Sequence, residues 1–270
     1  MTFKAHKQII VDMQHPLQII AIPAFKDNYI WLIHNSTDAI VVDPGDASPV
    51  ISTLDLLQLK LHTILITHHH QDHIGGVHTL LDKYSEAHVY APKNKLYDFK
   101  HTPVCEKEVI YLLDWNLELL VIELPGHTLD HVAYYISQPH EKWLFCGDTL
   151  FGAGCGRLFE GTPAQMLASL QKLAALAAET QVYCTHEYTL HNIDFAMTLE
   201  PNNKALIQRH QNTVKLRNHH QPSLPSSIAL ELATNPFLRC HSPEIQSSIQ
   251  LKNASELQVF SIIREMRNHY

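Results

Sequence analysis

A short segment rich in histidine, residues 67–73 (Thr-His-His-His-Gln-Asp-His), constrains the fold and function of this chain more than any other feature. It follows the apolar residues 63–66 (Thr-Ile-Leu-Ile), whose β-branched side chains predict a buried strand, and it leads into Gly75 and Gly76. A cluster of imidazoles and one carboxylate at the end of a strand is typical of a metal site. The alternative is a solvated polar loop in a chain that carries 21 histidines.

The spacing within this segment predicts ligands for two ions. Side chains two residues apart point the same way in an extended segment, so His68 and His70 converge on one ion while His69 points elsewhere. Asp72 and His73 lie just past the strand, where a turning chain aims both side chains at a second ion. Neutral imidazole and carboxylate together suit zinc, and also iron or manganese.

Three later strands each end on another potential ligand. Residues 117–124 precede His127, residues 142–146 precede Asp148, and residues 181–185 precede His186. Because open α/β sheets place their sites beyond strand ends, we expect all seven ligands at one edge of a sheet. Seven exceed the need of one tetrahedral ion and therefore indicate two ions. We expect His131 to be structural or to orient a ligand rather than to bind metal, because ligating imidazoles need such partners.

The remaining pattern predicts strands and helices up to Glu187 and helices alone beyond it. Strands are predicted at residues 17–24, 29–33, 39–42, 88–90 and 132–137, helices at 48–61 and 76–84, and loop with a short helix at 91–109. Thr162, Pro163 and Gln165 predict the start of a capped helix. The later helices are predicted at residues 202–218, 227–234 and 254–267.

The composition predicts a globular protein and excludes several classes of partner. The 270 residues are 45% hydrophobic and 17% charged, enough for one large domain or one with an appendage. The net charge of −7 argues against nucleic acid or an anionic membrane, and no apolar run approaches the length of a membrane span. Residues 1–12 lack the apolar core of a secretion signal. Five cysteines without a C-x-x-C pair predict reduced thiols and a cytoplasmic location.

Several motifs together resemble one enzyme family. Residues 67–73 are similar to the T-H-x-H-x-D-H signature of the metallo-β-lactamase superfamily. With residues 125–128, 147–151 and 184–188 included, the chain resembles the hydroxyacylglutathione hydrolase (glyoxalase II) family along nearly its whole length. Further matches lie at residues 25–29, 154–162 and 235–239. The histidine-rich segment specifies only the superfamily, whereas residues 154–162 and the C-terminal tail point to the family.

The resemblance implies the fold and its division into domains. The family fold is an α/β architecture, an αββα sandwich of two facing mixed sheets flanked by helices, followed by a small all-α domain. It implies a catalytic domain at residues 1–187, in which residues 1–16 extend beyond the family's usual start, and a helical glutathione-binding domain at residues 188–270. We expect a monomer whose partner is a small glutathione thioester, with neither nucleic acid nor a membrane as partner.

The resemblance also implies the role of each potential ligand. His68, His70 and His127 would hold one divalent metal ion, Asp72, His73 and His186 would hold the other, and Asp148 would bridge them. Zinc is the favoured metal, with iron and manganese as alternatives. The implied reaction is hydrolysis of S-D-lactoylglutathione and other S-2-hydroxyacylglutathiones to glutathione and a hydroxy acid such as D-lactate, the second step of methylglyoxal detoxification. A hydroxide bridging the ions would attack the thioester carbonyl, and Asp72 would orient it.

Further residues are implied to contact the glutathione moiety. Arg264 and Arg267 fall on the family's basic pair near the end of the chain. Family members commonly carry lysine at the second position, and arginine keeps the charge and can grip a carboxylate bidentately. Arg157 and Tyr188 match further contacts, and Phe159 stands where the family has an aromatic residue. Without the resemblance, two arginines on a terminal helix would indicate a solvated face.

Other functions on the same fold are alternatives. A persulfide dioxygenase would use one iron ion and normally lacks the helical appendage, so metal count and oxygen uptake would separate it. A nuclease would need a basic nucleic-acid surface, and a β-lactamase a different set of ligands for the second metal. The remaining alternative is a metal-storing or redox-sensing protein without catalytic turnover. Turnover that His68→Ala or Asp148→Ala abolishes would exclude it.

Overall fold

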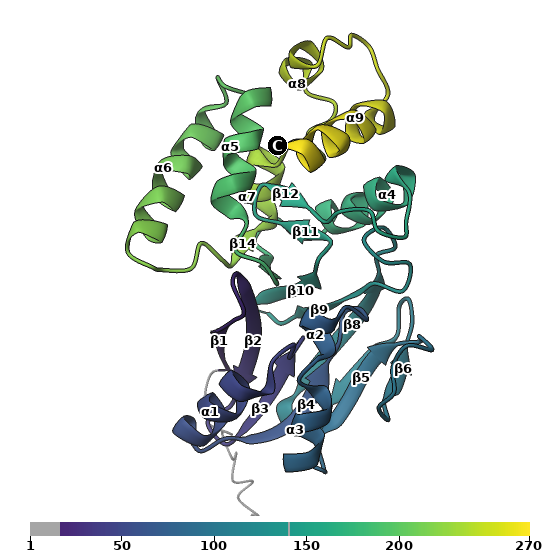
Figure 1. Cartoon of the computed structure of the whole chain (residues 1–270), viewed down its shortest axis with the longest axis vertical. Coiled ribbons are helices and arrows are strands. Elements are labelled where there is room, and N and C mark those ends of the chain that lie inside the picture. Colours follow the sequence, from purple (N-terminus) through teal and green to yellow (C-terminus); the bar gives the residue numbers. More distant parts are fainter. Residues whose placement is uncertain (1–16, 140) are drawn as a thin grey trace, which may run out of the picture.

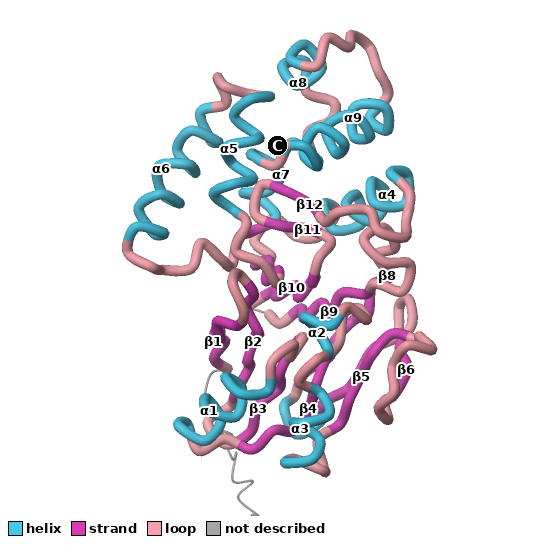
Figure 2. The backbone as a smooth tube through the Cα atoms, viewed as in Figure 1, coloured by secondary structure: helices cyan, strands magenta, loops and turns pink. Residues whose placement is uncertain are grey.

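Two facing sheets form the centre of the molecule in the computed structural model, which describes residues 17–139 and 141–270 (Figure 1). Each of the two sheets has six strands. The strands occupy one half of the molecule, and most of the later helices gather in the other half (Figure 2). The expected αββα sandwich followed by a helical region is thereby confirmed. The expectations for residues 1–16 lie outside the described residues.

The first sheet is built from the early part of the chain. Its order is β1 (Gln18–Ala24), β2 (Asn28–His34), β3 (Asp38–Val42), β4 (Lys60–Leu65), β5 (His88–Pro92) and β6 (Thr102–Val104). Strands β1 to β3 form an antiparallel meander, whereas β3 to β6 run parallel. Because parallel strands end at the same edge, β4 delivers the histidine-rich segment to that edge.

The second sheet faces the first and is built from the middle of the chain. Its order is β14 (Ser226–Ser227), β13 (Gln181–Cys184), β10 (Lys142–Gly147), β9 (Val132–Ser137), β8 (Leu117–Glu123) and β7 (Val109–Leu112). Strands β10 and β13 are parallel, and β9 lies antiparallel between β8 and β10. The carboxyl ends of β8, β10 and β13 therefore meet at one edge of this sheet.

Alternation along β2 shows how both faces of the first sheet are covered. Tyr29, Trp31 and Ile33 belong to the core shared with the second sheet, whereas Ile30 and Leu32 pack in a separate core beneath the helices. All five side chains are buried. A strand covered on both faces reads as a continuous apolar run, which explains why this strand was recognisable from the sequence.

Helices cover the outer faces of the sandwich and form the C-terminal region. They are α1 (Ala47–Leu57), α2 (Gln71–Ile74), α3 (Val77–Lys83), α4 (Pro163–Ala174), α5 (Thr189–Leu199), α6 (Lys204–Asn218), α7 (Ile228–Thr234), α8 (Pro243–Ser248) and α9 (Glu256–His269), with short 3-10 helices at Leu113–Trp115 and Pro236–Leu238. Helices α1 and α3 lie on the first sheet (Figure 1). None of the helices in the described part of the chain is long and apolar enough to cross a lipid bilayer.

The boundaries of the early helices follow local signals. The predicted capping box at the start of α4 is confirmed, because the Thr162 side chain accepts a hydrogen bond from the Gln165 backbone and the Gln165 side chain accepts one from the Thr162 backbone. Helix α1 ends earlier than expected. Gln58 adopts a left-handed conformation with φ of 55°, which stops the helix at Leu57 before β4 begins.

Two expectations for the fold were wrong, and several short elements were not predicted. Residues 91–109 contain no helix, and β6 pairs with β5 there, where Pro103 is tolerated because β6 is an edge strand. Strand structure does not stop at Glu187, because β14 pairs with β13 and joins the helical region to the second sheet. Helices α5 and α8 and the hairpin of β11 (Leu150–Phe151) and β12 (Gly154–Cys155) were not predicted. Tertiary contacts decide each of these short elements.

Candidate metal centre

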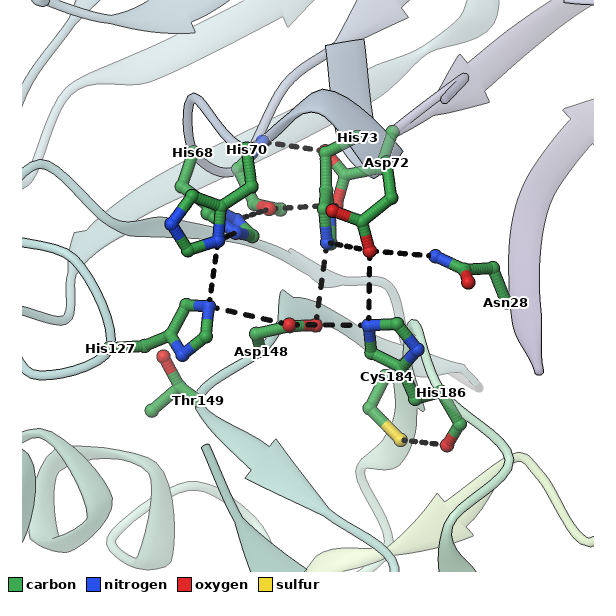
Figure 3. Close-up of polar contacts among 12 residues, drawn as sticks. Asn28, His68, His70, Asp72, His73, His127, Asp148, Thr149, Cys184 and His186 are labelled. Atoms are coloured by element: carbon green, nitrogen blue, oxygen red, sulfur yellow. Dashed lines mark hydrogen bonds and ion pairs between the residues drawn. The ribbon is translucent and has the colours of Figure 1, made fainter. Parts of the chain in front are cut away.

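The seven potential ligands meet between the two sheets (Figure 3). The histidine-rich segment follows β4 of the first sheet, whereas His127, Asp148 and His186 follow β8, β10 and β13 of the second. Figure 3 shows these two groups facing each other. The expectation that all seven lie at one edge of a single sheet was therefore wrong. Two sheets each contribute one edge, which lets side chains approach from opposite sides.

Three imidazoles form the first set of donors. His70 Nδ1 lies 3.1 Å from His68 Nε2 and 3.1 Å from His127 Nε2. His68 is fully buried and His127 is 4% exposed. Three nitrogens this close, contributed by two segments far apart along the chain, form the trigonal face that a tetrahedral metal ion requires.

A second set of donors combines two imidazoles with a carboxylate. Asp72 Oδ2 lies 3.7 Å from His73 Nε2 and 3.5 Å from His186 Nε2. Asp148 lies between the two sets, with Oδ1 3.6 Å from His73 Nε2 and Oδ2 3.2 Å from His186 Nε2. The same Oδ2 is 3.4 Å from His127 Nε2. Asp148 is thus within reach of donors of both sets.

The backbone at the end of β10 explains how Asp148 reaches this place. Gly147 has φ of +47°, a left-handed conformation that glycine adopts readily. A Cβ atom on Gly147 would lie 2.4 Å from the Thr67 hydroxyl oxygen. The loops after β4 and β10 can approach closely only because this position is glycine.

Further groups fix the orientation of the ligand rings from behind. His73 Nδ1 lies 2.9 Å from Asp43 Oδ2, and Thr67 donates two hydrogen bonds to the same carboxylate. His186 Nδ1 lies 2.8 Å from Asp27 Oδ1. Such partners select the tautomer that presents Nε2 to a metal. No role was predicted for Asp27 or Asp43; residues 25–29 match the family, but nothing local shows that either carboxylate orients a ligand ring.

Two more rings follow the same principle. The Arg157 carbonyl accepts a hydrogen bond from His127 Nδ1 at 2.9 Å. His131 is stacked on His68 with ring centroids 4.8 Å apart, and its Nε2 accepts a hydrogen bond from the Asp148 backbone. His131 therefore supports the site instead of joining the donors, as expected.

The electrostatics of the second set centre on Asp148. Burial would raise the pKa of this carboxyl, but His186 and His73 hold it well below its usual range. Burial opposes protonation of His186, yet Asp148 raises the pKa of this ring to about 9. In the first set, burial and the neighbouring His73 hold the pKa of His68 well below its usual value. The first set thus offers neutral imidazoles, whereas the second set lies beside the ionised Asp148 carboxylate, which attracts positive charge.

Two buried atoms test whether the site suits metal ions. His73 Nε2 and Asp148 Oδ1 have no hydrogen-bond partner among the described residues, although they lie only 3.6 Å apart. Buried polar atoms left unpaired are costly, and a cation between them would satisfy both. The donor atoms of each set also lie within 4.8 Å of one another. These residues fit a dinuclear metal centre.

The cavity in front of the centre has a volume of about 510 Å³. It brings together five of the seven metal donors, all but the buried His68 and His73, and the five residues expected to contact substrate, which are Arg157, Phe159, Tyr188, Arg264 and Arg267. Tyr188 is stacked on His186 with ring centroids 4.7 Å apart. His191 and Asn192 also line this cavity from α5, and neither these residues nor this helix was predicted from the sequence.

The two C-terminal arginines differ in their surroundings. Arg264 is 4% exposed, and it donates to the carbonyl oxygen of Cys155 at 2.8 Å and to Asn268 at 3.1 Å. Arg267 donates to Asn192 Oδ1 through two nitrogens, at 3.0 and 3.2 Å. Arg264 therefore holds β12 in place as well as lining the cavity, which its position on a terminal helix did not reveal.

Comparison with known proteins agrees with this architecture. The family model for the metallo-beta-lactamase superfamily matches residues 25–186, and the model for the hydroxyacylglutathione hydrolase C-terminus matches residues 187–270. A protein named hydroxyacylglutathione hydrolase from Methylobacillus flagellatus is 54% identical over 253 residues, which cover 94% of this chain and 99% of that protein.

Solved structures share the fold at lower identity. ETHE1 from Myxococcus xanthus superposes with a TM-score of 0.62 and 22% identity, covering 93% of this chain and 98% of that chain. TTHA1623, solved in a di-iron-bound form, has a TM-score of 0.59 and 23% identity, covering 81% of this chain and 100% of that chain. From the two family matches and the full-length relative, the chain belongs to the hydroxyacylglutathione hydrolase family of the metallo-beta-lactamase superfamily.

Proposed function

We propose that this protein hydrolyses S-D-lactoylglutathione and related S-2-hydroxyacylglutathiones, releasing glutathione and the free hydroxy acid. The observation that carries the proposal is a single cavity in which a cluster of metal donors meets three arginines. The name of the relative from Methylobacillus flagellatus supports the same substrate class. A thioester is an activated acyl group, so its hydrolysis needs a nucleophile at neutral pH more than an acid for the leaving thiolate.

The proposed cofactor is a pair of divalent metal ions, with zinc favoured over iron or manganese. Imidazole and carboxylate donors suit all three metals. When bound, such ions lower the pKa of water to about 7 and polarise a carbonyl group. We assign His68, His70 and His127 to one ion, Asp72, His73 and His186 to the other, and Asp148 to both.

Asp72 is the residue that we propose orients the attacking water. Its side chain is 41% exposed, so it faces the cavity while the other donors of its set are buried. Asn28 donates a hydrogen bond to Asp72 Oδ2 at 3.1 Å and fixes the carboxylate. No described residue donates to Oδ1 of Asp72, so this oxygen is available to accept a hydrogen bond from water.

The arginines are proposed to hold the glutathione moiety. Burial, and then the neighbouring Arg264 and Arg157, lower the pKa of Arg267 because like charges lie close together. An anion between them would relieve this repulsion, and glutathione carries two carboxylates that arginine can bind bidentately. Phe159 would contribute an apolar surface to the cavity beside these arginines, since its side chain is 65% exposed and its ring lies 5.5 Å from that of His70.

We also propose the organisation of the enzyme as a whole. Residues 1–187 would form the catalytic domain and residues 188–270 the glutathione-binding domain, because the two family matches meet between residues 186 and 187. The described cysteines are free, in keeping with a cytoplasmic location. We propose a monomer that uses neither nucleic acid nor a membrane as partner. Light scattering and cell fractionation would test these two assignments.

The decisive experiment is a thiol-release assay on protein loaded with zinc. We expect rapid release of free thiol from S-D-lactoylglutathione, with two ions per chain by elemental analysis. The matched control is the protein after metal removal by a chelator, which should regain activity when zinc is restored. Protein that carries both ions and releases no thiol would contradict the proposed function.

A further inference from the structure

One histidine of the metal segment, His69, lies outside the two sets of metal donors and contacts a separate polar cluster. His69 Nδ1 lies 3.0 Å from Asp130 Oδ1, and His69 Nε2 lies 3.3 Å from Glu160 Oε1. The His69 side chain is only 10% exposed, although it lies in a loop. Asn94 donates a hydrogen bond to Asp130 Oδ2 at 2.7 Å, and its Nδ2 also lies 3.1 Å from His69 Nδ1. Through its two ring nitrogens, His69 thus contacts the segments that carry Asn94, Asp130 and Glu160.

Residues 157–161, which we call the cavity wall, are the more informative of these segments. The cavity wall carries Arg157 and Phe159, both of which line the substrate cavity. The backbone of Phe159 donates to the His127 carbonyl at 3.2 Å, and Glu160 Oε2 accepts from the Leu129 backbone at 2.8 Å. These bonds attach the cavity wall to the loop after β8.

Attachment of the cavity wall to the other ligand loop rests on fewer contacts. Among the described residues, the polar contact between the cavity wall and residues 67–70 is the one from Glu160 to His69. Phe159 also lies against His70, with ring centroids 5.5 Å apart, but an edge contact between two rings permits sliding. The cavity wall is thus bonded directly to His127, and its position relative to residues 67–70, which carry the other two ligands of the first set, depends on His69.

We propose that His69 is a positioning residue, which holds the cavity wall against the metal-ligand loop and so fixes the width of the cavity for glutathione-bearing ligands. This inference rests on the proposed function. His69 contributes neither to metal binding nor to the reacting atoms. Its loss should weaken the binding of glutathione conjugates without loss of metal, because the cavity wall would lose its polar contact with residues 67–70.

The test measures ligand binding separately from turnover. Isothermal titration calorimetry of the zinc-loaded enzyme with S-methylglutathione, a thioether that cannot be hydrolysed, reports the dissociation constant directly. We expect His69→Ala to raise it roughly threefold, because the 3.3 Å contact between His69 Nε2 and the partly exposed Glu160 carboxylate is lost. Elemental analysis should give the same metal content as in the unsubstituted protein. An unchanged dissociation constant, or the loss of an ion, would overturn the proposal.

Two further variants separate positioning from a general loss of structure. In His69→Asn the amide replaces Nδ1 and can still donate to Asp130, but it is too short to reach Glu160. We expect this variant to fold and to bind S-methylglutathione as weakly as His69→Ala does. The double variant His69→Ala with Glu160→Ala should bind no more weakly than Glu160→Ala alone, because Glu160→Ala already removes the contact with His69. If the double variant raised the dissociation constant by the product of the two single effects, the proposed contact between His69 and Glu160 would be contradicted.

A matched control comes from a histidine–carboxylate pair elsewhere. His78 Nε2 lies 2.7 Å from Asp98 Oδ1, and both side chains are more than half exposed, at 58% and 79%. His78→Ala should leave the dissociation constant unchanged.

The thioester assay of the unsubstituted enzyme separates the positioning role of His69 from the proposed reaction. The unsubstituted enzyme could release no thiol from the thioester and still bind S-methylglutathione more tightly than His69→Ala does. In that case the proposed reaction fails and the positioning role of His69 stands.

Discussion

The metal end and the cationic end of the cavity are built in different ways. At the metal end, His73 and His186 are each held by a carboxylate that does not line the cavity, Asp43 and Asp27 respectively. At the cationic end, Arg264 lines the cavity and also bonds to the backbone of the neighbouring hairpin. The metal end thus separates support from function, whereas the cationic end combines them in one side chain.

The largest effect is expected where the two metal sets meet. Asp148→Asn keeps the shape of the side chain but removes the negative charge that lies near donors of both sets. We expect loss of bound metal and a fall in kcat/KM greater than the roughly 100-fold typical of a supporting residue. Elemental analysis with the thiol-release assay measures both. Full occupancy by two ions in this variant would contradict the position assigned to Asp148.

A supporting residue of the metal end should have a smaller effect. Asp43 has φ of +52°, a conformation that asparagine tolerates, so Asp43→Asn leaves the backbone unstrained. The amide would no longer accept from both Thr67 and His73, and we expect a loss of about 10- to 100-fold in metal affinity. Competition with a chromogenic chelator measures this affinity. Asp98→Asn, in the exposed pair with His78, is the control and should have no effect.

The cationic end should respond differently in its two arginines. Arg267→Ala is expected to raise KM about tenfold with little change in kcat, because the group acts far from the scissile bond. Arg264→Ala should raise KM similarly and also lower the free energy of unfolding by about 1–3 kcal/mol, because it leaves the buried Cys155 carbonyl without its donor. Steady-state kinetics and urea unfolding separate these effects. Arg267→Lys, which keeps the charge, is the control; equal unfolding curves for the two alanine variants would remove the distinction.

The smallest effect is expected just beyond the cavity wall. Thr162 caps α4 directly after residues 157–161, and its side chain accepts a hydrogen bond from the Gln165 backbone. Thr162→Ala should lower the free energy of unfolding by about 1 kcal/mol and leave KM unchanged. Urea unfolding and the thioester assay measure the two quantities. A large rise in KM would mean that the helix start, and not only His69, controls the cavity wall.

Local sequence patterns revealed the metal end far better than its supports. His68, His70, Asp72 and His73 lie within one short segment after a recognisable strand, so their shared role was visible without coordinates. Asp27 and Asp43 were not recognised, because an aspartate in a turn has the same local sequence whether or not it faces a ring 159 or 30 residues away. The division into two opposed edges was missed for the same reason.

The amino-acid sequence by itself determined the kinds of donor atoms, their attachment to strand ends and the alternation that buries both faces of strands such as β2. These features follow from local periodicity, which each segment carries independently of its neighbours. Only the tertiary structure decided that His69 turns toward Asp130 and Glu160, that Arg264 bonds to the hairpin, and that β14 completes the second sheet. Each of these depends on contacts between segments far apart along the chain, whose free energy no local pattern records.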